Sequence, residues 1–315
     1  MPCYRPISAY RSRSGRSYVP GDAPGYPSGK WPVVFSVKDG YPDMPVVVPC
    51  GQCIGCRLER SRQWAVRCVH EAKLHAENCF ITLTYDDVHL PRSVDLETGE
   101  INAGVLPSLN KRDIQLFFKR FRKRFGEGIR YFQCGEYGSL HSRPHHHAIV
   151  FGFDFPDKVL LFEKRGVKLF SSAILSELWP HGLSSIGDVT FESAAYVARY
   201  ILKKINGEKA DDHYVGRLPE YVTMSRRPGI AHDYYEQYGL DIYANDLVFI
   251  RDNVVARPPR YYDRLYDLTN HSDFARICLR RRRCAVNGPD NSFERLVVRE
   301  RVQFLRSKQL TRSLD

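Results

Sequence analysis

The chain has 315 residues, a formal net charge of +11 and a pI of about 9.2, a length that allows one large or two modest domains. An apolar fraction of 43% is adequate for a hydrophobic core. The basic balance favours nucleic acid over membrane as the partner, because no apolar run approaches bilayer-spanning length. The polar start, with Pro2, predicts no secretory signal. Nine cysteines without such a signal favour free thiols or metal ligands over disulfides.

Residues 1–49 are rich in Gly, Pro, Ser and Tyr, which predicts an irregular arm with short strands such as 33–37. Next come Cys50, Cys53 and Cys56, whose Cys-x-x-Cys spacing lets thiolates from one turn reach one ion. Cys3 is the obvious fourth ligand, so the four cysteines form a candidate Zn²⁺ site. A reduced cysteine cluster without metal is the alternative.

Helical spacing of apolar residues predicts a helix over about 57–78, a strand over 79–85, and a loop over 86–109. Asn110 can cap the next helix. The expected buried face of that helix consists of Ile114, Phe117, Phe118, Phe121 and Phe125. Its cations are Lys119, Arg120, Arg122, Lys123 and Arg124. They form either a solvated face or a surface that follows DNA phosphates, and the two interpretations are compatible.

The stretch 143–152, RPHHHAIVFG, is typical of a strand that ends at a glycine. Side chains alternate along a strand, so His145 and His147 share one face, about 6–7 Å apart, and His146 points to the other. Two imidazoles on one face can hold a metal ion. Histidines at the surface, or satisfied in a core, are the alternative.

The segment 129–136 also predicts a strand, and the breaker-rich residues after it favour a hairpin that places Glu136 beside His145. Two imidazoles and one carboxylate leave open positions on a metal ion, which suits a catalytic ion better than a structural one. Cys134 and His141 are the competing ligands. A solvated hairpin end is the other interpretation of Glu136.

The region 158–183 predicts a connection with a short helix near 172–178, and 186–191 predicts a last strand. A helix then follows, with Ser193 as its N-cap. Tyr196 and Tyr200 are i,i+4 neighbours on this helix, with Cβ atoms about 6 Å apart. With Lys203 and Lys204 nearby, the two hydroxyls could act as paired phosphate nucleophiles. Two half-buried packing tyrosines are the alternative.

The element order, with helices interleaved with a hairpin, predicts an α+β fold with a central, mainly antiparallel sheet. We expect helices on one face and the metal site on the other. The expected regions are an arm with the cysteine cluster and a helix (1–78), a nuclease core (79–206) and a Tyr/Arg-rich C-terminal region (207–315). The last region predicts an extended segment at 258–262 and a helical basic tail from 280 onward.

Three motifs in this order resemble those of HUH-type rolling-circle replication initiators, most closely the initiation proteins of gokushovirus-like microviruses. They are FITLTY at 80–85, Gly135-Glu136 before Pro144-His145-His146-His147, and YVARY at 196–200. PCGQCIGCR at 49–57 and PPRYYD at 258–263 also look similar. The pattern usually has a bulky apolar residue where this chain has His146.

The resemblance implies an endonuclease and strand transferase that acts on single-stranded DNA at a viral origin. Glu136, His145 and His147 would hold Mg²⁺ or Mn²⁺, and Tyr196 or Tyr200 would form a 5′-phosphotyrosine link. It also implies work with host replication machinery in the bacterial cytoplasm, with no membrane partner. Two other functions fit the residues: a non-enzymatic zinc-containing DNA-binding protein, and a metal-dependent nuclease in which water attacks.

Overall fold

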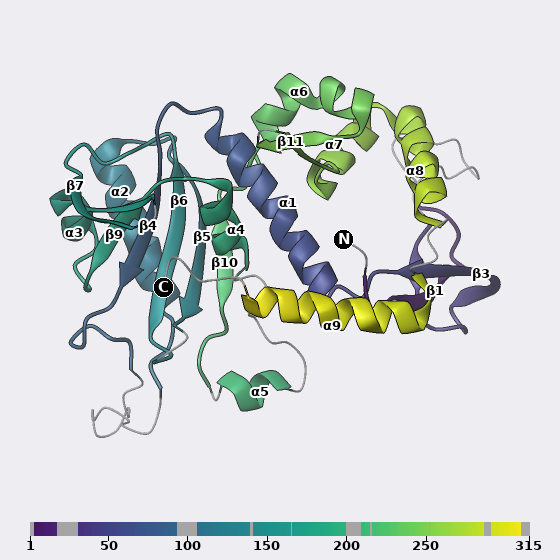
Figure 1. Cartoon of the computed structure of the whole chain (residues 1–315), viewed down its shortest axis with the longest axis horizontal. Helices are drawn as coiled ribbons and strands as arrows, with labels where there is room; N and C mark the ends of the chain where they lie inside the picture. Colours follow the sequence, from purple (N-terminus) through teal and green to yellow (C-terminus); the bar gives the residue numbers. More distant parts are fainter. Residues whose placement is uncertain are drawn as a thin grey trace. The chain divides into compact units, whose positions relative to one another are not determined.

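The computed structural model describes residues 3–17, 31–92, 106–138, 141–164, 166–199, 209–214, 216–251, 253–286 and 291–309 (Figure 1). The chain divides into two compact units. We call Met1–Glu59 with Ala285–Asp315 the cysteine unit, and Arg60–Cys284 the sheet unit. The boundaries expected at residues 78 and 206 stay predictions.

The sheet unit is built on a seven-stranded sheet with the order β10-β5-β6-β4-β9-β8-β7, in which every pairing is antiparallel (Figure 1). Its strands are β4 (Asn78–Thr84), β5 (Arg130–Tyr137), β6 (Pro144–Phe151), β7 (Val159–Lys164), β8 (Val167–Ser171), β9 (Ser184–Gly187) and β10 (Tyr221–Met224). The histidine strand β6 lies between β5 and β4, so both of its edges are hydrogen-bonded.

One face of the sheet packs on α2 (Lys111–Phe125) and α3 (Ala173–Leu178) (Figure 1). Asn110 caps α2 as expected, because its side chain accepts a hydrogen bond from the backbone N–H of Arg112. The expected apolar face of α2 is buried in this core, with Phe125 at its margin. The predicted α+β class with a mainly antiparallel sheet is therefore confirmed.

The opposite face of the sheet carries α4 (Phe191–Arg199) and the part of α1 (Ile54–Ala72) that belongs to the sheet unit. The ring of Tyr196 on α4 lies 5.2 Å from that of His147, centroid to centroid. The ring of Trp64 on α1 lies 5.1 Å from that of Phe132 on β5. Helices therefore lie on both faces of the sheet and partly cover the face of the metal ligands, where element order predicted no helix.

Further helices and strands complete the sheet unit, and none of their described residues belongs to the buried cluster between the sheet and α2. They are α5 (Lys209–Tyr214), α6 (His232–Asn245), β11 (Val248–Arg251), β12 (Val254–Ala256), α7 (Arg260–Thr269) and most of α8 (His271–Val286). The cysteine unit holds a three-stranded antiparallel sheet of β1 (Ile7–Ser12), β2 (Val33–Val34) and β3 (Gly40–Val48), together with α9 (Phe293–Gln309). Helices α8 and α9 confirm the helical basic C-terminal region. In the part of the chain that is described, no helix combines the length and hydropathy needed to cross a bilayer.

Several local expectations differ from the structure. The short strands expected in the arm exist, but β1 to β3 pair into a sheet, and β2 covers only Val33–Val34 of the strand expected at 33–37. The connection at 158–183 contains the β7–β8 hairpin before α3. The strand expected at 186–191 ends at Gly187, and α4 starts at Phe191, because Thr190 and Ser193 exchange side chain-to-backbone hydrogen bonds of 2.8 and 3.1 Å.

The segment 258–262 is extended only at its prolines. Pro259 occupies the N-cap position of α7 without a side-chain hydrogen bond, and the helix begins at Arg260. Tyr262 and Tyr266 are buried one turn apart on α7, and their burial stabilises a helix directly after the proline.

Candidate metal centre

The register of the β5–β6 hairpin creates the candidate metal centre. Glu136 pairs directly with His145, and Cys134 pairs with His147, so all four side chains lie on one face of the sheet. The hairpin predicted from the breaker-rich connection therefore exists, with Glu136 beside His145. On the other edge of β6, Thr82 of β4 pairs with His147.

Both imidazoles point their Nε2 atoms at one carboxylate oxygen. Nε2 of His145 lies 2.6 Å and Nε2 of His147 lies 3.1 Å from Oε1 of Glu136. One ligand atom from each residue falls within 4.8 Å of the others. Three potential ligands thus converge on one small volume.

The far sides of the two rings are also held. Nδ1 of His145 lies 3.1 Å from the carbonyl oxygen of Arg143, and Nδ1 of His147 lies 2.9 Å from Oγ1 of Thr82. A carbonyl only accepts, so Nδ1 of His145 must carry the proton. In the neutral ring, Nε2 then presents a lone pair to the Glu136 carboxylate. Two facing acceptors need a cation between them, either a proton or a metal ion.

Glu136 is 1% exposed, yet its charge is stabilised. Burial alone would raise the pKa of this carboxyl, but the hydrogen bonds with His145 and His147 outweigh that effect and lower the pKa to about 2. The group is therefore a carboxylate at neutral pH. A buried anion with two imidazoles aimed at it is a donor set that a divalent cation fits.

The structure separates the three consecutive histidines. His146 points to the opposite face, is fully buried, and lies 3.2 Å from the hydroxyl of Tyr85. Burial lowers the pKa of His146 to about 3, so it is a neutral core residue. Of the two competing ligands, Cys134 is buried on the same face of the sheet and His141 is exposed in the turn. Among the described residues, neither belongs to the three-residue group.

Tyr196 lies on the same side of the sheet as the imidazoles. It is 8% exposed, and its ring meets His147 edge-on and Phe80 at 6.4 Å. The backbone of α4 is tied to α1 through a 3.3 Å hydrogen bond from Ser61 Oγ to the carbonyl of Ala195. Tyr200, Lys203 and Lys204 lie outside the described residues.

Comparison with known proteins identifies the family. The family model for replication-associated protein ORF2/G2P matches residues 78–205. The chain is 34% identical over 278 residues to replication-associated protein ORF2 of Spiroplasma virus 4, covering 84% of this chain and 80% of that protein. It is 30% identical over 283 residues to replication-associated protein VP4 of Bdellovibrio phage phiMH2K, covering 87% and 79%. The chain belongs to this family of phage replication-associated proteins.

Family membership confirms the resemblance drawn from the three motifs. A third relative, replication-associated protein ORF4 of Chlamydia phage 1, is 32% identical over 201 residues, which cover 61% of this chain and 46% of that protein. The family model spans Glu136, His145, His147 and Tyr196, but not the cysteine cluster. No solved structure shows significant similarity to the chain.

The five cations expected on α2 have different surroundings. Arg120 donates to the carbonyl of Leu178, and Arg124 pairs with Glu177, so both bind the α3 segment. The other three, Lys119, Arg122 and Lys123, line a cavity. Arg226 and Arg227, which follow β10, line it as well and were not predicted. Their adjacency in the sequence was a visible signal, but only the fold brings them opposite α2.

The four cysteines of the cysteine unit form a second candidate metal site. Sγ of Cys3 lies 3.6 Å from Sγ of Cys50 and 3.8 Å from Sγ of Cys53, and all four sulfur atoms lie within 4.8 Å of one another. Tetrahedral zinc with Zn–S bonds of about 2.3 Å places its sulfur atoms about 3.8 Å apart. The backbone N–H groups of Tyr4, Cys50, Cys53 and Cys56 point at these sulfur atoms at 3.3 to 3.5 Å.

The thiols have unequal acidities. Burial acts to raise the pKa of Cys53, but hydrogen bonds from the backbone N–H groups of Cys56 and Tyr4 help to lower it to about 7. Burial raises the pKa of Cys3 and Cys56. One thiolate near neutral pH is a starting ligand for a metal ion, whose charge would deprotonate the others.

Proposed function

We propose that this protein initiates rolling-circle replication of a phage genome by cutting one strand of the origin with a tyrosine hydroxyl. The observation that carries the proposal is the convergence of Glu136, His145 and His147 on a sheet face that also bears Tyr196, whose ring lies 5.2 Å from that of His147. Membership in a family of phage replication-associated proteins supports DNA as the substrate.

Glu136, His145 and His147 would hold Mg²⁺ or Mn²⁺. Such an ion would supply charge withdrawal from a non-bridging phosphate oxygen, which favours nucleophilic attack. The chain supplies the carboxylate charge and fixes both imidazoles through Arg143 and Thr82, so both rings are oriented before an ion binds.

Tyr196 or Tyr200 would attack the phosphorus atom in line. The phenol oxygen forms an O–P bond, the bond to the 3′-oxygen breaks, and the leaving oxygen takes a proton. The products are a 5′-phosphotyrosine and a free 3′-hydroxyl. A phenol has an ordinary pKa of ~10, so Lys203 or Lys204 would stabilise the phenolate or the charge developing on the phosphate. The covalent link retains the bond energy, so rejoining needs no ATP.

The second tyrosine would cut the regenerated origin at the end of a round and close the displaced strand. The 3′-hydroxyl would be extended by the replication machinery of the bacterial host, which places the reaction in the host cytoplasm. For the cysteine unit we propose Zn²⁺ bound by Cys3, Cys50, Cys53 and Cys56, because the sulfur spacing matches a tetrahedral site.

The test uses single-stranded oligonucleotides that tile the viral strand, incubated with the protein and Mn²⁺ and separated under denaturing conditions. Tyrosine attack links the downstream fragment to the protein. A 3′ label should therefore migrate with the protein, and a 5′ label should appear on a shortened free oligonucleotide. Cut DNA without an adduct would assign the attack to water, and retention without cutting would leave only DNA binding.

Variants connect the adduct to named residues. Tyr196→Phe with Tyr200→Phe should abolish the adduct, and Tyr238→Phe, a change at an exposed helical tyrosine, should not alter it. Glu136→Gln should slow adduct formation at least about 100-fold, because Lewis-acid catalysis contributes several kcal/mol. His141→Gln, at the exposed competing ligand, is the matched control. An undiminished adduct in the double tyrosine variant rules the proposal out.

A further inference from the structure

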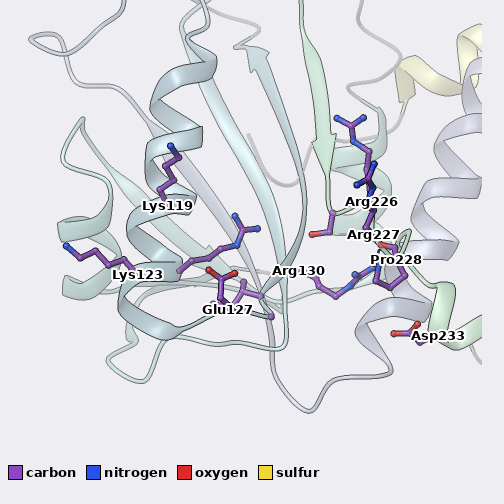
Figure 2. Close-up of a pocket in the computed structure, with 12 residues that line it drawn as sticks. Lys119, Lys123, Glu127, Arg130, Arg226, Arg227, Pro228 and Asp233 are labelled. Atoms are coloured by element: carbon purple, nitrogen blue, oxygen red, sulfur yellow. Dashed lines mark hydrogen bonds between the residues drawn. The ribbon is translucent and has the colours of Figure 1, made fainter.

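A cavity of about 820 Å³ lies between α2 and the segment that follows β10 (Figure 2). Lys119 and Lys123 come from α2 on one side, and Arg226 and Arg227 from the segment after β10 on the other. Glu127 lies between them in the view. Arg122, Arg130 and Asp233 also line this cavity, so cations outnumber acids six to two.

Not every cation there is available to a ligand. Arg130 pairs with Glu71 and donates to the carbonyl oxygens of Pro228 and Gly229 at 3.1 Å, so it holds the fold together. The exposed Lys119, Lys123, Arg226 and Arg227 have no ion pair with any described residue. With Arg122 they make five cations, and the two acids leave a net charge of +3. Such a surface attracts a polyanion.

An aromatic surface adjoins the cationic one. A second hollow of about 200 Å³ shares Lys119 and Arg122 with the cavity, and Phe118, Tyr131 and Thr223 line it too. The buried Phe118 ring stacks on one face of the half-buried Tyr131 ring at 4.0 Å, and the Arg122 guanidinium lies 5.5 Å from the Tyr131 ring centroid, so of these two rings only that of Tyr131 can meet a base. A cationic groove with aromatic rings is the usual surface for single-stranded nucleic acid, because phosphates follow the cations while bases stack on the rings.

This groove is remote from the metal centre. Tyr131 and Glu136 lie on the same strand, five residues apart, which corresponds to about 17 Å. Alternation also sends their side chains to opposite faces of the sheet. Tyr131 packs with the α2 core, and Glu136 faces the imidazoles. DNA bound in the groove is therefore held away from the reacting phosphate.

We infer that the groove formed by Lys119, Arg122, Lys123, Tyr131, Arg226 and Arg227 binds the backbone of single-stranded DNA and stacks one base. The inference rests on DNA being the substrate, as proposed above, but not on the nicking chemistry. The groove tethers the strand outside the metal centre, so it governs affinity and leaves the chemical step to other residues.

The test measures fluorescence anisotropy of a labelled dT30 oligonucleotide without added Mg²⁺ or Mn²⁺, so that cutting does not contribute and zinc stays in the cysteine unit. Each phosphate contact with single-stranded DNA contributes about 0.7 to the slope of log K against log salt. Arg226→Gln with Arg227→Gln removes two contacts, so the slope should decrease by about 1.4, and binding near 0.1 M salt should weaken roughly 10- to 30-fold. The matched control is Arg282→Gln with Arg283→Gln, an adjacent exposed pair on α8.

Stacking is tested separately. Tyr131→Leu should weaken dT30 binding about 5-fold or more without changing the salt slope, and Tyr131→Phe, which keeps the ring, should not weaken it. Thermal melting checks that each variant is folded. The proposed groove would be wrong if the Arg226/Arg227 and Arg282/Arg283 double variants lost equal DNA affinity. It would also be wrong if the Arg226/Arg227 variant kept the wild-type salt slope. If Tyr131→Leu weakened binding of a blunt duplex of the same length as much as it weakens dT30 binding, the groove would not be specific for single-stranded DNA. Because wild-type binding is measured without added Mg²⁺ or Mn²⁺, failure here is distinct from failure to form the covalent adduct.

Discussion

His70 is a buried residue whose hydrogen bonds define a single protonation state. It is 1% exposed on α1, with Nε2 3.2 Å from the carbonyl of Phe249 and Nδ1 2.9 Å from the hydroxyl of Tyr262. The carbonyl requires a proton on Nε2, so Nδ1 accepts from the tyrosine. A second proton would break that bond, and burial lowers the pKa of His70 to about 4.

The low pKa predicts a pH-dependent stability. The folded pKa of about 4 lies below the ordinary value of 6.5, so between these values the unfolded chain binds more protons at this residue. The stabilisation is complete above pH 6.5 and is lost as the pH falls toward 4, with a limiting slope of about 1.4 kcal/mol per pH unit. Glutamine retains hydrogen-bonding groups but does not titrate, so His70→Gln should flatten the profile by that amount.

The measurement is the free energy of unfolding from urea titrations at pH 7.5, 6.5, 5.5 and 4.5, with His141→Gln as the exposed control. His146 is also buried and neutral, so the wild-type profile contains its contribution too. The comparison between variants isolates His70. Parallel profiles for wild type and His70→Gln would show that His70 is not the titrating group.

Residue-level prediction from the sequence succeeded where it depended on periodicity. Strand alternation correctly put His145 and His147 on one face, and the breaker-rich connection correctly put Glu136 beside them. Thr82 behind His147 was not predictable, because it depends on the register of β4, a strand more than 60 residues earlier. The burial of Glu136 was not predictable either, because the helix that packs over this face, α4, comes later in the chain.

At the scale of the element, the cationic side chains of α2 have two different roles, although the sequence shows them as one basic run. Arg120 donates a 3.1 Å hydrogen bond to Leu178 O, where the C-terminal carbonyls of α3 lack helical partners. Lys123, less than one turn later, lines the cationic cavity. Helical periodicity separates buried from exposed residues, but it cannot tell which cations a neighbouring element occupies.

Matched substitutions should separate these two roles. Arg120→Gln should lower the free energy of unfolding by about 1–2 kcal/mol, the usual worth of a partly buried charged hydrogen bond, with dT30 affinity unchanged. Lys123→Gln should do the reverse, weakening DNA binding while leaving stability within about 0.5 kcal/mol. Urea titration and fluorescence anisotropy on the same preparations measure both. If Arg120→Gln and Lys123→Gln weakened dT30 binding equally, the two residues would not have separate roles.

Other elements show the limits of local pattern. The β7–β8 hairpin was not predicted, because β7 is exposed along its whole length and its sequence shows no alternation of apolar and polar residues. Gly166, with a φ of +77°, makes its turn. At α7 the two prolines suggested an extended chain, but burial of Tyr262 and Tyr266 outweighed that local preference.

For the molecule as a whole, the cysteine unit has little apolar core to stabilise it. Among the described residues its buried cluster consists of Tyr4, Cys53 and Leu296, with Cys3, Cys50, Cys56 and Ile54 packed against it. The sheet unit has the extensive core between its sheet and α2. A small core often depends on a metal ion, so bound zinc would supply much of the folding free energy of the cysteine unit.

Zinc removal should therefore affect the two units unequally. Purified protein should contain one zinc per chain by elemental analysis, Cys53→Ser should lose it, and Cys284→Ser, at an exposed cysteine outside the cluster, should keep it. A site occupied at 1,000 times its Kd contributes about 4 kcal/mol. Chelation should thus lower one calorimetric transition by roughly 15 °C or more and leave the other within a few degrees. Added Zn²⁺ should restore the lost transition, and Mg²⁺ should not, which separates this site from Glu136, His145 and His147. If wild-type protein contained no zinc, or if it unfolded in one cooperative transition that chelation did not shift, zinc would not stabilise the cysteine unit.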